Sequence, residues 1–525
     1  MKKQLPILAF LLIASIDSSA QITFQKIYGG AVYDIGYSVQ QTTDGGYVIV
    51  GTTNSFGAGN YDIYLLKTDA YGNLQWSKTF GGAGYDGSAV LSDPYSVQQT
   101  NDGGYVITGH TDSFGAGGID VYLLRTDANG NLLWSKTFGG TLNDYGAEVR
   151  QTTDGGYVIA GRTRSFGNGW YAYLVKTDAI GNLTWTKAFG GTFGGFMGFD
   201  VQQTADGGYI LTGAQTTDSI GYRDVSLVKT DSAGNLLWLK TFGGIYSEEG
   251  HSIQQTADGG YVIGGLTNSF GSGGWDVYLL RTDSAGSLLW SKTFGGALYD
   301  WGYSVQLTAG GGIMIAGTSE SFGGGYYDYY LLKTDDSGNL IWSRTFGSTT
   351  SDFGCFARQT TDGGYVLAGT GMSFFPKIYL VKTDSSGYSG CNESNPASIT
   401  TVPVTVTTTP AVLNSSGGAV SNPATVTGNG GTDTTLCFVT AIYEQETGTD
   451  ITVYPVPATT ELRIKNAEFR IGEIEIYDAH GQKVLTKKAT NEKQLTINVS
   501  SLTPGIYFVK GFHAGKYYRK KIIIG

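Results

Sequence analysis

The chain has 525 residues, including 81 glycines, with only 15% charged residues and a formal net charge of −10. This length exceeds one ordinary core, and the low charged fraction with 35 tyrosines and 24 phenylalanines excludes a disordered polyanion. Aromatic and β-branched residues are divided by Gly, Asn and Asp without a long helical periodicity, which predicts an all-β protein. An acidic body without a basic stripe argues against nucleic acid as a partner.

The first 20 residues have the three parts of a secretory signal peptide. Lys2 and Lys3 precede an apolar run of about a dozen residues, and Ser18-Ser19-Ala20 ends it, so that cleavage would leave Gln21 first. No later segment reaches the ~20 apolar residues that a membrane-spanning helix needs, so we expect no transmembrane segment. The mature protein should therefore be secreted, either soluble or attached to a surface.

A repeat of 52 residues fills positions 21–390. Each period contains four strand-like pieces, for example YSVQQT, GYVIVGTT, DIYLLKTD and NLQWSKTF, and Asp-Gly or Gly-Asn turns join them. The two middle pieces are apolar on both faces, as strands covered on both sides must be. We therefore predict a seven-bladed β-propeller of four-stranded repeats. The seven copies are marked by Asp44, Asp102, Asp154, Asp206, Asp258, a degenerate site at Gly310, and Asp362.

The ends of the repeat region predict how this ring closes. A tryptophan marks the fourth strand of six copies, whereas the seventh copy has Ser394 at that spacing. The N-terminal segment QITFQKIYGG matches LQWSKTFGG, with Phe24 standing 52 residues before Trp76. We expect the N-terminal strand to supply the missing outer strand of the last blade and so remove an open sheet edge. The six tryptophans are Trp76, Trp134, Trp185, Trp238, Trp290 and Trp342.

The strand WSKTFGG resembles the tryptophan-bearing outer strand of quinoprotein-type propellers, with Asp127, Gly130 and Trp134 at a slightly shorter spacing. The resemblance extends to the fold only. This chain has seven repeats rather than eight, lacks vicinal cysteines and shows no evident quinone or calcium site. We therefore expect no cofactor.

Residues 391–447 are rich in Thr, Ser, Pro, Gly and Val, which predicts a linker whose Val-Thr alternation could form a minor strand or two. Cys391 and Cys437 bracket this segment and could pair in an exported, oxidising environment. Residues 448–525 form short alternating segments divided by Pro and Gly, enough for a small β-sandwich.

Three ordered motifs in the last 75 or so residues resemble the C-terminal sorting domain of type IX secretion system cargo from Bacteroidetes. They are VYPxPAxxxL at Val453–Leu462, IYDxxGxxV at Ile476–Val484, and LxxGIYFV at Leu502–Val509. Val456 stands where Asn is frequent, and the chain ends in Ile-Ile-Ile-Gly after Lys521. The resemblance implies that the type IX machinery recognises residues 448–525 at the outer membrane, and that this domain is then cut off and commonly replaced by a surface glycolipid link.

Two loops of each repeat should lie on one face of the predicted disc, and this face holds the candidate ligand-binding residues. An acid recurs in the first loop of six repeats, and a residue needed by every blade is most simply explained as an acceptor for backbone N–H groups. Trp170, Trp275 and Trp301 instead break the repeat, and aromatic rings beside carboxylates suit a sugar-binding surface. The candidates are Trp170, Trp275, Trp301, Asp34, Asp144, Glu248 and Asp300.

No residue is assigned as catalytic, because catalysis needs an asymmetric pair of acids and a ring of equivalents predicts none. The four histidines are scattered and no Cys/His spacing suits zinc, so no metal site is expected. The leading hypothesis is a noncatalytic secreted or surface-displayed propeller that binds a glycan or a protein. One alternative is a polysaccharide-active enzyme, a glycoside hydrolase or lyase, that uses the face carboxylates. Another is a passive surface-layer protein.

Overall fold

The computed structural model describes residues 21–524 with internal gaps. The residues left out are 88–94, 192, 194, 372–374, 397–398, 402–405, 409–412, 416–418, 422–425, 429–431, 441–450, 455–457, 459, 467–470, 479–482, 493 and 514–515. The predicted signal peptide, residues 1–20, lies outside the described part and stays a prediction. The described residues form two compact units, Gln21–Val439 and Thr440–Gly525.

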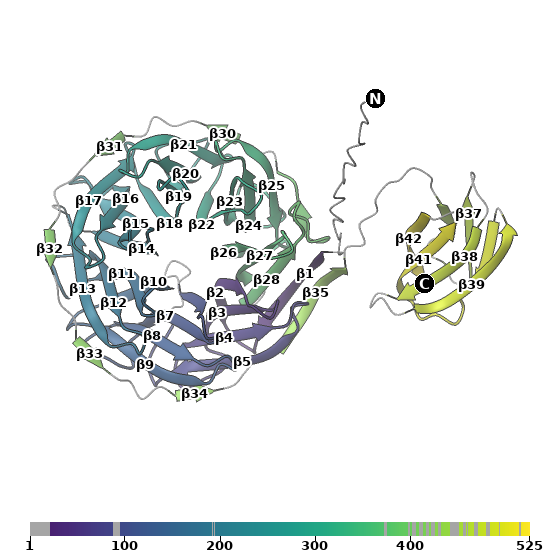
Figure 1. Ribbon diagram of the computed structural model, residues 1–525, viewed down its shortest axis with the longest axis horizontal. Helices are drawn as coiled ribbons and strands as arrows, with labels where there is room; N and C mark the ends of the chain where they lie inside the picture. The colour runs from purple at the N-terminus through teal and green to yellow at the C-terminus, as the bar shows by residue number, and fades with distance from the viewer. Residues whose placement is uncertain are drawn as a thin grey trace, which may run out of the picture. The chain divides into compact units, whose positions relative to one another are not determined.

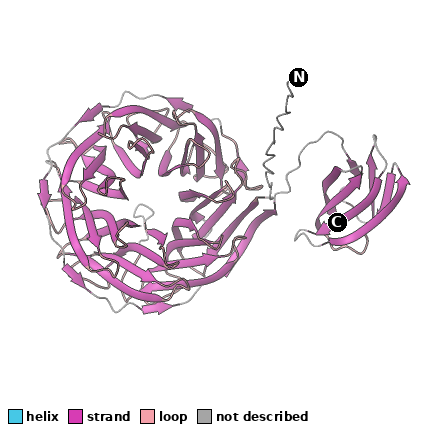
Figure 2. Ribbon diagram, in the orientation of Figure 1, coloured by secondary structure: helices cyan, strands magenta, loops and turns pink. Residues whose placement is uncertain are grey.

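The first unit is built from antiparallel sheets of the predicted four strands, which stand in a ring in Figures 1 and 2. Seven such sheets occur among the described residues. The inner strands are β2 (Asp34–Gln41), β6 (Ser96–Gln99), β10 (Asp144–Gln151), β14 (Phe196–Gln203), β18 (Glu248–Gln255), β22 (Asp300–Leu307) and β26 (Asp352–Gln359). The second strands are β3 (Tyr47–Thr53), β7 (Tyr105–Thr111), β11 (Tyr157–Thr163), β15 (Tyr209–Thr216), β19 (Tyr261–Thr267), β23 (Ile313–Ser319) and β27 (Tyr365–Gly371).

The third and fourth strands complete each sheet. The third strands are β4 (Asp62–Thr68), β8 (Asp120–Thr126), β12 (Tyr171–Thr177), β16 (Arg223–Thr230), β20 (Asp276–Thr282), β24 (Asp328–Thr334) and β28 (Lys377–Thr383). The fourth strands are β5 (Leu74–Gly81), β9 (Leu132–Gly139), β13 (Leu183–Gly190), β17 (Leu236–Gly243), β21 (Leu288–Gly295), β25 (Leu340–Phe346) and, in the last sheet, β1 (Ile22–Gly29). The hydrophobic clusters join neighbouring sheets, which explains why the middle strands are apolar on both faces.

The predicted turn chemistry is confirmed in the hairpins. In the Asp-Gly-Gly turn between β2 and β3, Gly45 has a φ of 83° and Asp44 accepts a hydrogen bond from the Gly46 N–H at 3.1 Å. The carboxylate of Asp44 also lies 2.8 Å from the buried ammonium of Lys67. In the sixth sheet, where Gly310 replaces this acid, the Lys333 ammonium instead donates to the Gly311 carbonyl at 2.6 Å. The turn residue at this position therefore accepts hydrogen bonds both from the turn backbone and from a buried lysine.

The predicted pairing of the N-terminal strand with the last repeat is also confirmed. β1 pairs antiparallel with β28, and Phe24 lies opposite Lys382 as Trp76 lies opposite Lys67 in the first sheet. The Phe24 ring is buried and contacts Tyr47 of the first sheet edge-on at 6.0 Å between centroids. The Thr361 N–H of the last sheet donates to Gln41 Oε1 of the first at 2.8 Å. The first and last sheets are thus in direct contact.

Residues 391–447 were expected to be a linker, but the described strands between Glu393 and Thr440 each add a fifth strand to one sheet. We call these strands the belt; at the edge of the ring in Figure 1 they follow the sheets in reverse order and end on β1. Each belt strand pairs with the backbone N–H and C=O groups at the open edge of a fourth strand. This pairing makes the segment a strand, and composition alone does not reveal it. The belt consists of β29 (Glu393–Ser394), β30 (Ile399–Thr401), β31 (Val406–Thr408), β32 (Leu413–Ser415), β33 (Ala419–Ser421), β34 (Val426–Gly428) and β35 (Thr432–Thr440).

The second unit contains two sheets, with orders β36-β37-β40 and β39-β38-β41-β42. Leu462 and Ile464 of the first sheet share one buried core with Ile474, Val509 and Ile522 of the second. Two sheets that enclose one core agree with the β-sandwich expected from the alternating sequence. The strands are β36 (Ile451–Tyr454), β37 (Glu461–Asn466), β38 (Ile471–Asp478), β39 (Lys483–Glu492), β40 (Gln494–Asn498), β41 (Gly505–His513) and β42 (Lys516–Ile524).

Candidate ligand-binding face

Two loops of each repeat meet on one side of the ring, and we call this side the loop face. The loop before the inner strand contacts the loop between the second and third strands: Val32 N–H donates to Ser55 Oγ at 2.9 Å, and Asn54 N–H donates to the Tyr33 carbonyl at 3.0 Å. This agrees with the sequence prediction that both loops share a face.

The four predicted acids have no exposed surface. Asp34, Asp144, Glu248 and Asp300 each begin an inner strand and accept a hydrogen bond from the N–H of the residue four positions earlier, at 2.7, 2.8, 2.8 and 2.7 Å. Each also accepts from serine or threonine hydroxyls of the second loop, such as Ser55 to Asp34 at 3.0 Å. These contacts favour the structural interpretation, because a carboxylate enclosed by its own loops does not reach a substrate oxygen.

A second series of acids lies beside the first. Burial, together with the charge of a neighbouring carboxylate, raises the pKa of Asp62, Asp120 and Asp224 to about 6 and that of Asp276 to about 7. Asp62 and Asp120 are 1% exposed, and the Oδ1 atom of each has no hydrogen-bond partner among the described residues. These are buried acids whose titration affects stability, and they do not form an accessible reaction centre.

The three non-repeating tryptophans are half-buried on the loop face. Trp301 lies between the Tyr299 and Tyr327 rings, with centroids 6.1 and 5.4 Å away and interplanar angles of 27° and 20°. The carbonyl of Trp275 accepts the Asp300 N–H at 2.6 Å, so the backbone of Trp275 lies beside the residue that precedes Trp301. Trp170 belongs to the third sheet and contacts Tyr145 at 5.6 Å.

Large apolar side chains are exposed in the loops of the loop face. The most exposed are Ile220 at 76%, with Ile245 and Tyr326 both at 74%. All members of this group lie in the two loop types of the loop face. They are Tyr33, Tyr85, Leu142, Phe193, Ile220, Ile245, Tyr246, Leu298, Tyr299, Tyr326 and Phe375. Exposed apolar side chains gathered on one face are typical of interaction surfaces.

Glutamines on the inner strands link each sheet to the next, as the predicted polar lining requires. Gln40 Oε1 accepts the Gln99 N–H at 2.7 Å, and Gln98 Oε1 accepts the Gln151 N–H at 2.6 Å. The same bond recurs from Gln202, Gln254 and Gln306. Arginine replaces glutamine at this position in two sheets.

The two arginines create a charged cluster instead. Arg150 lies 2.9 Å from Glu148 and 3.6 Å from Asp200, and Arg358 donates to Ser304 Oγ at 3.2 Å. Burial and the Asp200 charge raise the pKa of Glu148, while Arg150 opposes the shift. The cluster balances two cations with two anions and therefore presents no net charge to a ligand.

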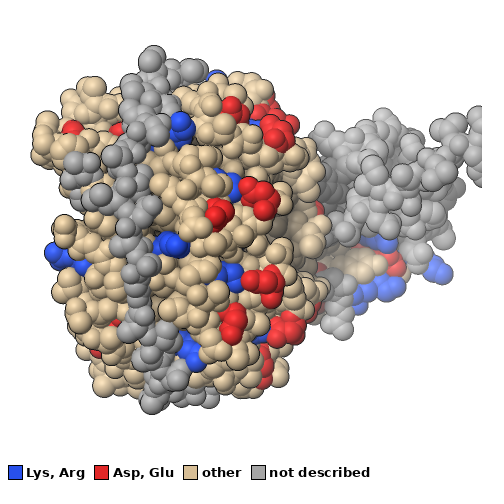
Figure 3. Space-filling model, turned by 60° about the vertical axis from the view of Figure 1, so that its left-hand side comes forward, with Lys and Arg blue, Asp and Glu red and all other residues tan. Residues whose placement is uncertain are grey.

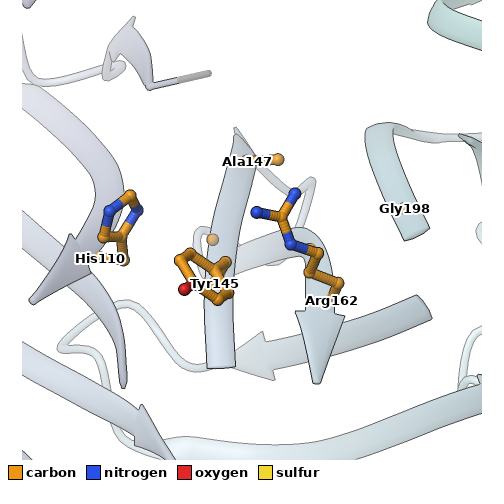
Figure 4. Close-up of a pocket in the computed structure, with 7 residues that line it drawn as sticks. His110, Tyr145, Ala147, Arg162 and Gly198 are labelled. Atoms are coloured by element: carbon orange, nitrogen blue, oxygen red, sulfur yellow. The ribbon is translucent and has the colours of Figure 1, made fainter. Parts of the chain in front are cut away.

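Sequence reasoning overlooked a hollow between the second, third and fourth sheets. It is a small hollow lined by His110, Tyr145, Gly146, Ala147, Gly161, Arg162 and Gly198. Figure 4 shows the Arg162 guanidinium beside Ala147, with Tyr145 between it and His110. The available signal was Ala147, which stands at the repeat spacing where the adjacent copies have Tyr95 and Phe199.

Neither a cluster of cationic side chains nor a metal site was found in the described part of the loop face. In the view of Figure 3, Lys and Arg are scattered singly, whereas Asp and Glu gather toward one side. In the described part of the chain, no three His, Cys, Asp or Glu side chains form a group that could hold a metal ion. No helix found there is long and apolar enough to cross a membrane.

Comparisons with known proteins identify the second unit. Residues 452–525 match the family model of the secretion system C-terminal sorting domain. Proteins with this domain are exported by type IX secretion, so this protein is directed to the cell surface or the extracellular space and interacts with that machinery.

The repeat region has more distant similarities. A stretch of 200 residues is 26% identical to the regulatory protein FlaEY of Caulobacter vibrioides, covering 33% of this chain and 20% of the relative. The chain thus spans about a fifth of that relative's length. Two solved structures are similar at TM-scores below 0.5. Sqt1 from Chaetomium thermophilum has a TM-score of 0.37 and 12% identity, covering 67% of this chain and 82% of Sqt1. A protein of unknown function from Dyadobacter fermentans has a TM-score of 0.39 and 10% identity, covering 70% and 99%.

Proposed function

We propose that the seven sheets are the blades of a closed β-propeller, and that this exported protein binds a glycan or a protein through its loop face. The contact between the first and last sheets supports closure: Phe24 occupies the place that tryptophan has in the other fourth strands and packs on Tyr47 across the junction. A closed ring presents its loops as one continuous rigid surface, which suits recognition.

The observation that carries the binding proposal is the aromatic group around Trp301. Tyr299, Trp301 and Tyr327 form a stack on the loop face, and Tyr327 continues it to Phe353 at 4.3 Å. The equivalent loops elsewhere hold a stack of two rings, Tyr61 and Tyr85, so the longer series around Trp301 is a local departure from the repeat, and this asymmetry favours a ligand. Flat rings of this kind bind the apolar faces of sugars or serve as anchors of protein interfaces.

The test compares the intact protein with a Trp275→Ala/Trp301→Ala variant on a glycan array and against immobilised surface proteins. We expect the double variant to lose at least tenfold in affinity for the ligand that the intact protein binds. Leu289→Ala is the matched control, because Leu289 is 56% exposed but lies on the outer strand β21. Equal loss in the control, or no binding by the intact protein, would contradict the proposal and favour a passive surface-layer role.

A further inference from the structure

The two ends of the belt lie on neighbouring sheets. Its first strand, β29, pairs with β25 of the sixth sheet, where Ser394 lies opposite Thr345. The next five strands follow on the fifth, fourth, third, second and first sheets, and the last, β35, adjoins β1 of the seventh sheet. Phe346 of β25 and Tyr379 of β28 share one hydrophobic cluster, so the sixth and seventh sheets are in direct contact. The belt therefore passes along all seven sheets and returns to the sheet next to its start.

The residues just before β29 are attached to β1. The buried Gln25 side chain of β1 donates from Nε2 to Ser389 Oγ at 2.8 Å and to the Cys391 carbonyl. Its Oε1 accepts from Asn392 Nδ2 at 3.1 Å. The Gly347 N–H, directly after β25, donates to the Asn392 carbonyl at 3.1 Å. Cys391 thus lies where the sixth and seventh sheets meet, beside Gln25 of β1.

The other end of the belt reaches the same part of β1. In the first five sheets, one belt residue lies opposite the glycine that ends the fourth strand, and these belt residues are six or seven positions apart in sequence. They are Ile399, Val406, Leu413, Ala419 and Val426. One more step of this length brings Thr432 or Asp433 opposite Gly29, the last residue of β1. Because these belt strands run antiparallel to the fourth strands, the same pairing puts Cys437 opposite Phe24 or Gln25.

Cys391 is disulfide-bonded, and the chain has two other cysteines. Cys437 belongs to β35, next to β1, whereas Cys355 belongs to β26, three strands away from β1 in the same sheet. Three strand spacings amount to roughly 14 Å, well beyond the Cα separation that a disulfide bridges. We infer that Cys391 and Cys437 form the bond, and that it closes the belt into a covalent hoop around the seven sheets.

Thiol–disulfide exchange in the exported environment accounts for the formation of this bond. The thiolate of one cysteine attacks the disulfide of an oxidant and forms a mixed disulfide, and the second thiolate then displaces the oxidant. The oxidant leaves as two thiols, so it takes up the two electrons and the two protons that the cysteines lose. Because the two cysteines meet only once β29 and β35 are both in place, the bond marks a completed belt.

The hoop protects a segment whose single strands are short. The strands β30 to β34 have three residues each, so each is held to its sheet by few backbone hydrogen bonds. Such strands open most readily from a free end of the segment. The bond fixes both ends of the belt beside β1, and the seventh sheet is then held between its neighbours by a closed loop. Cys437 stands before Val439, the last residue of the first unit, so the hoop is complete within that unit.

Peptide mapping tests the pairing of the cysteines. No lysine or arginine stands between residues 391 and 437, so trypsin alone leaves both cysteines in one peptide. Trypsin combined with a glutamate-specific protease yields three separate cysteine peptides, residues 345–358, 383–393 and 394–444. We expect the nonreduced protein to give 383–393 joined to 394–444, with a free thiol in 345–358. A cross-link that includes 345–358, or free thiols in all three peptides, would overturn the inference.

The role of the hoop is tested on the whole chain in denaturant. We expect reduction to raise the unfolding rate at least tenfold and to accelerate hydrogen exchange in residues 394–440, whereas β4 keeps its protection in native buffer. The Cys391→Ser/Cys437→Ser variant should show both effects without a reductant. Cys355→Ser is the matched control and should keep the slow unfolding of the oxidised protein and its response to reduction. If reduction of the intact protein changes neither the unfolding rate nor the exchange, the hoop does not hold the belt. None of these measurements depends on a ligand of the loop face.

Discussion

Replacement of Phe24 tests whether the N-terminal strand holds the ring together. Its ring has no exposed surface, and it packs on Tyr47 of the first sheet and beside Gly72, where an added Cβ would lie 2.7 Å from the ring. Phe24→Ala leaves a cavity at the junction of the first and last sheets. Buried Phe→Ala changes cost about 3–5 kcal/mol, and little collapse is expected between two hydrogen-bonded sheets.

The matched control is Phe24→Trp, which installs the residue of the other six fourth strands. The surroundings are the same there, because Gly130 meets the Trp76 ring as Gly72 meets Phe24. We expect this variant to remain within about 1.5 kcal/mol of the natural protein. All nine tryptophans lie before residue 343, so tryptophan fluorescence during denaturant unfolding reports on the first unit alone. If Phe24→Ala unfolded at the same denaturant concentration as the natural protein, the sealing role of β1 would be refuted.

Two further predictions concern the repeats. The pKa of Asp62, Asp120 and Asp224 is raised to about 6 and that of Asp276 and Asp352 to about 7, so the folded state binds protons more tightly than the unfolded chain between about pH 4 and 7. These carboxyl groups therefore lower the free energy of unfolding as pH rises through that window. Asp276→Asn should weaken this pH dependence, measured as the difference in unfolding free energy between denaturant titrations at pH 5 and pH 8. A steeper pH dependence in the variant would contradict the raised pKa of Asp276. Gly130→Ala should lower the melting temperature more than Gly103→Ala. Both have positive φ, but the added methyl meets Trp76 at 2.6 Å only at Gly130, and equal shifts would show that backbone strain alone decides.

Much of the first unit could be predicted because its turns and strands depend on the residue types within a short stretch of sequence. The Asp44 turn, the apolar third strand β4 and the position of Phe24 depend on residue type and spacing, and each recurs many times in the chain. The belt could not be predicted in the same way. A segment such as Val406–Thr408 has only three residues in a strand, and its partner Gly243 is far away in sequence, so only the open edge of β17 decides its conformation.

The candidate site also has a part that the sequence predicts and a part that depends on packing. The sequence predicted that the acids and the non-repeating tryptophans lie in loops, whereas Asp300 and Trp301 begin strand β22; burial separates Asp300, which its own loops enclose, from Trp301, which stacks among tyrosines. The hollow at Ala147 requires residues from three sheets, among them His110, Arg162 and Gly198. The sequence by itself determined the repeat and its strands, because these follow from local periodicity, and its last motifs indicated the sorting domain by resemblance. Only the tertiary structure decided which side chains face a ligand and where the belt lies, because both depend on surfaces that exist only once distant repeats pack together.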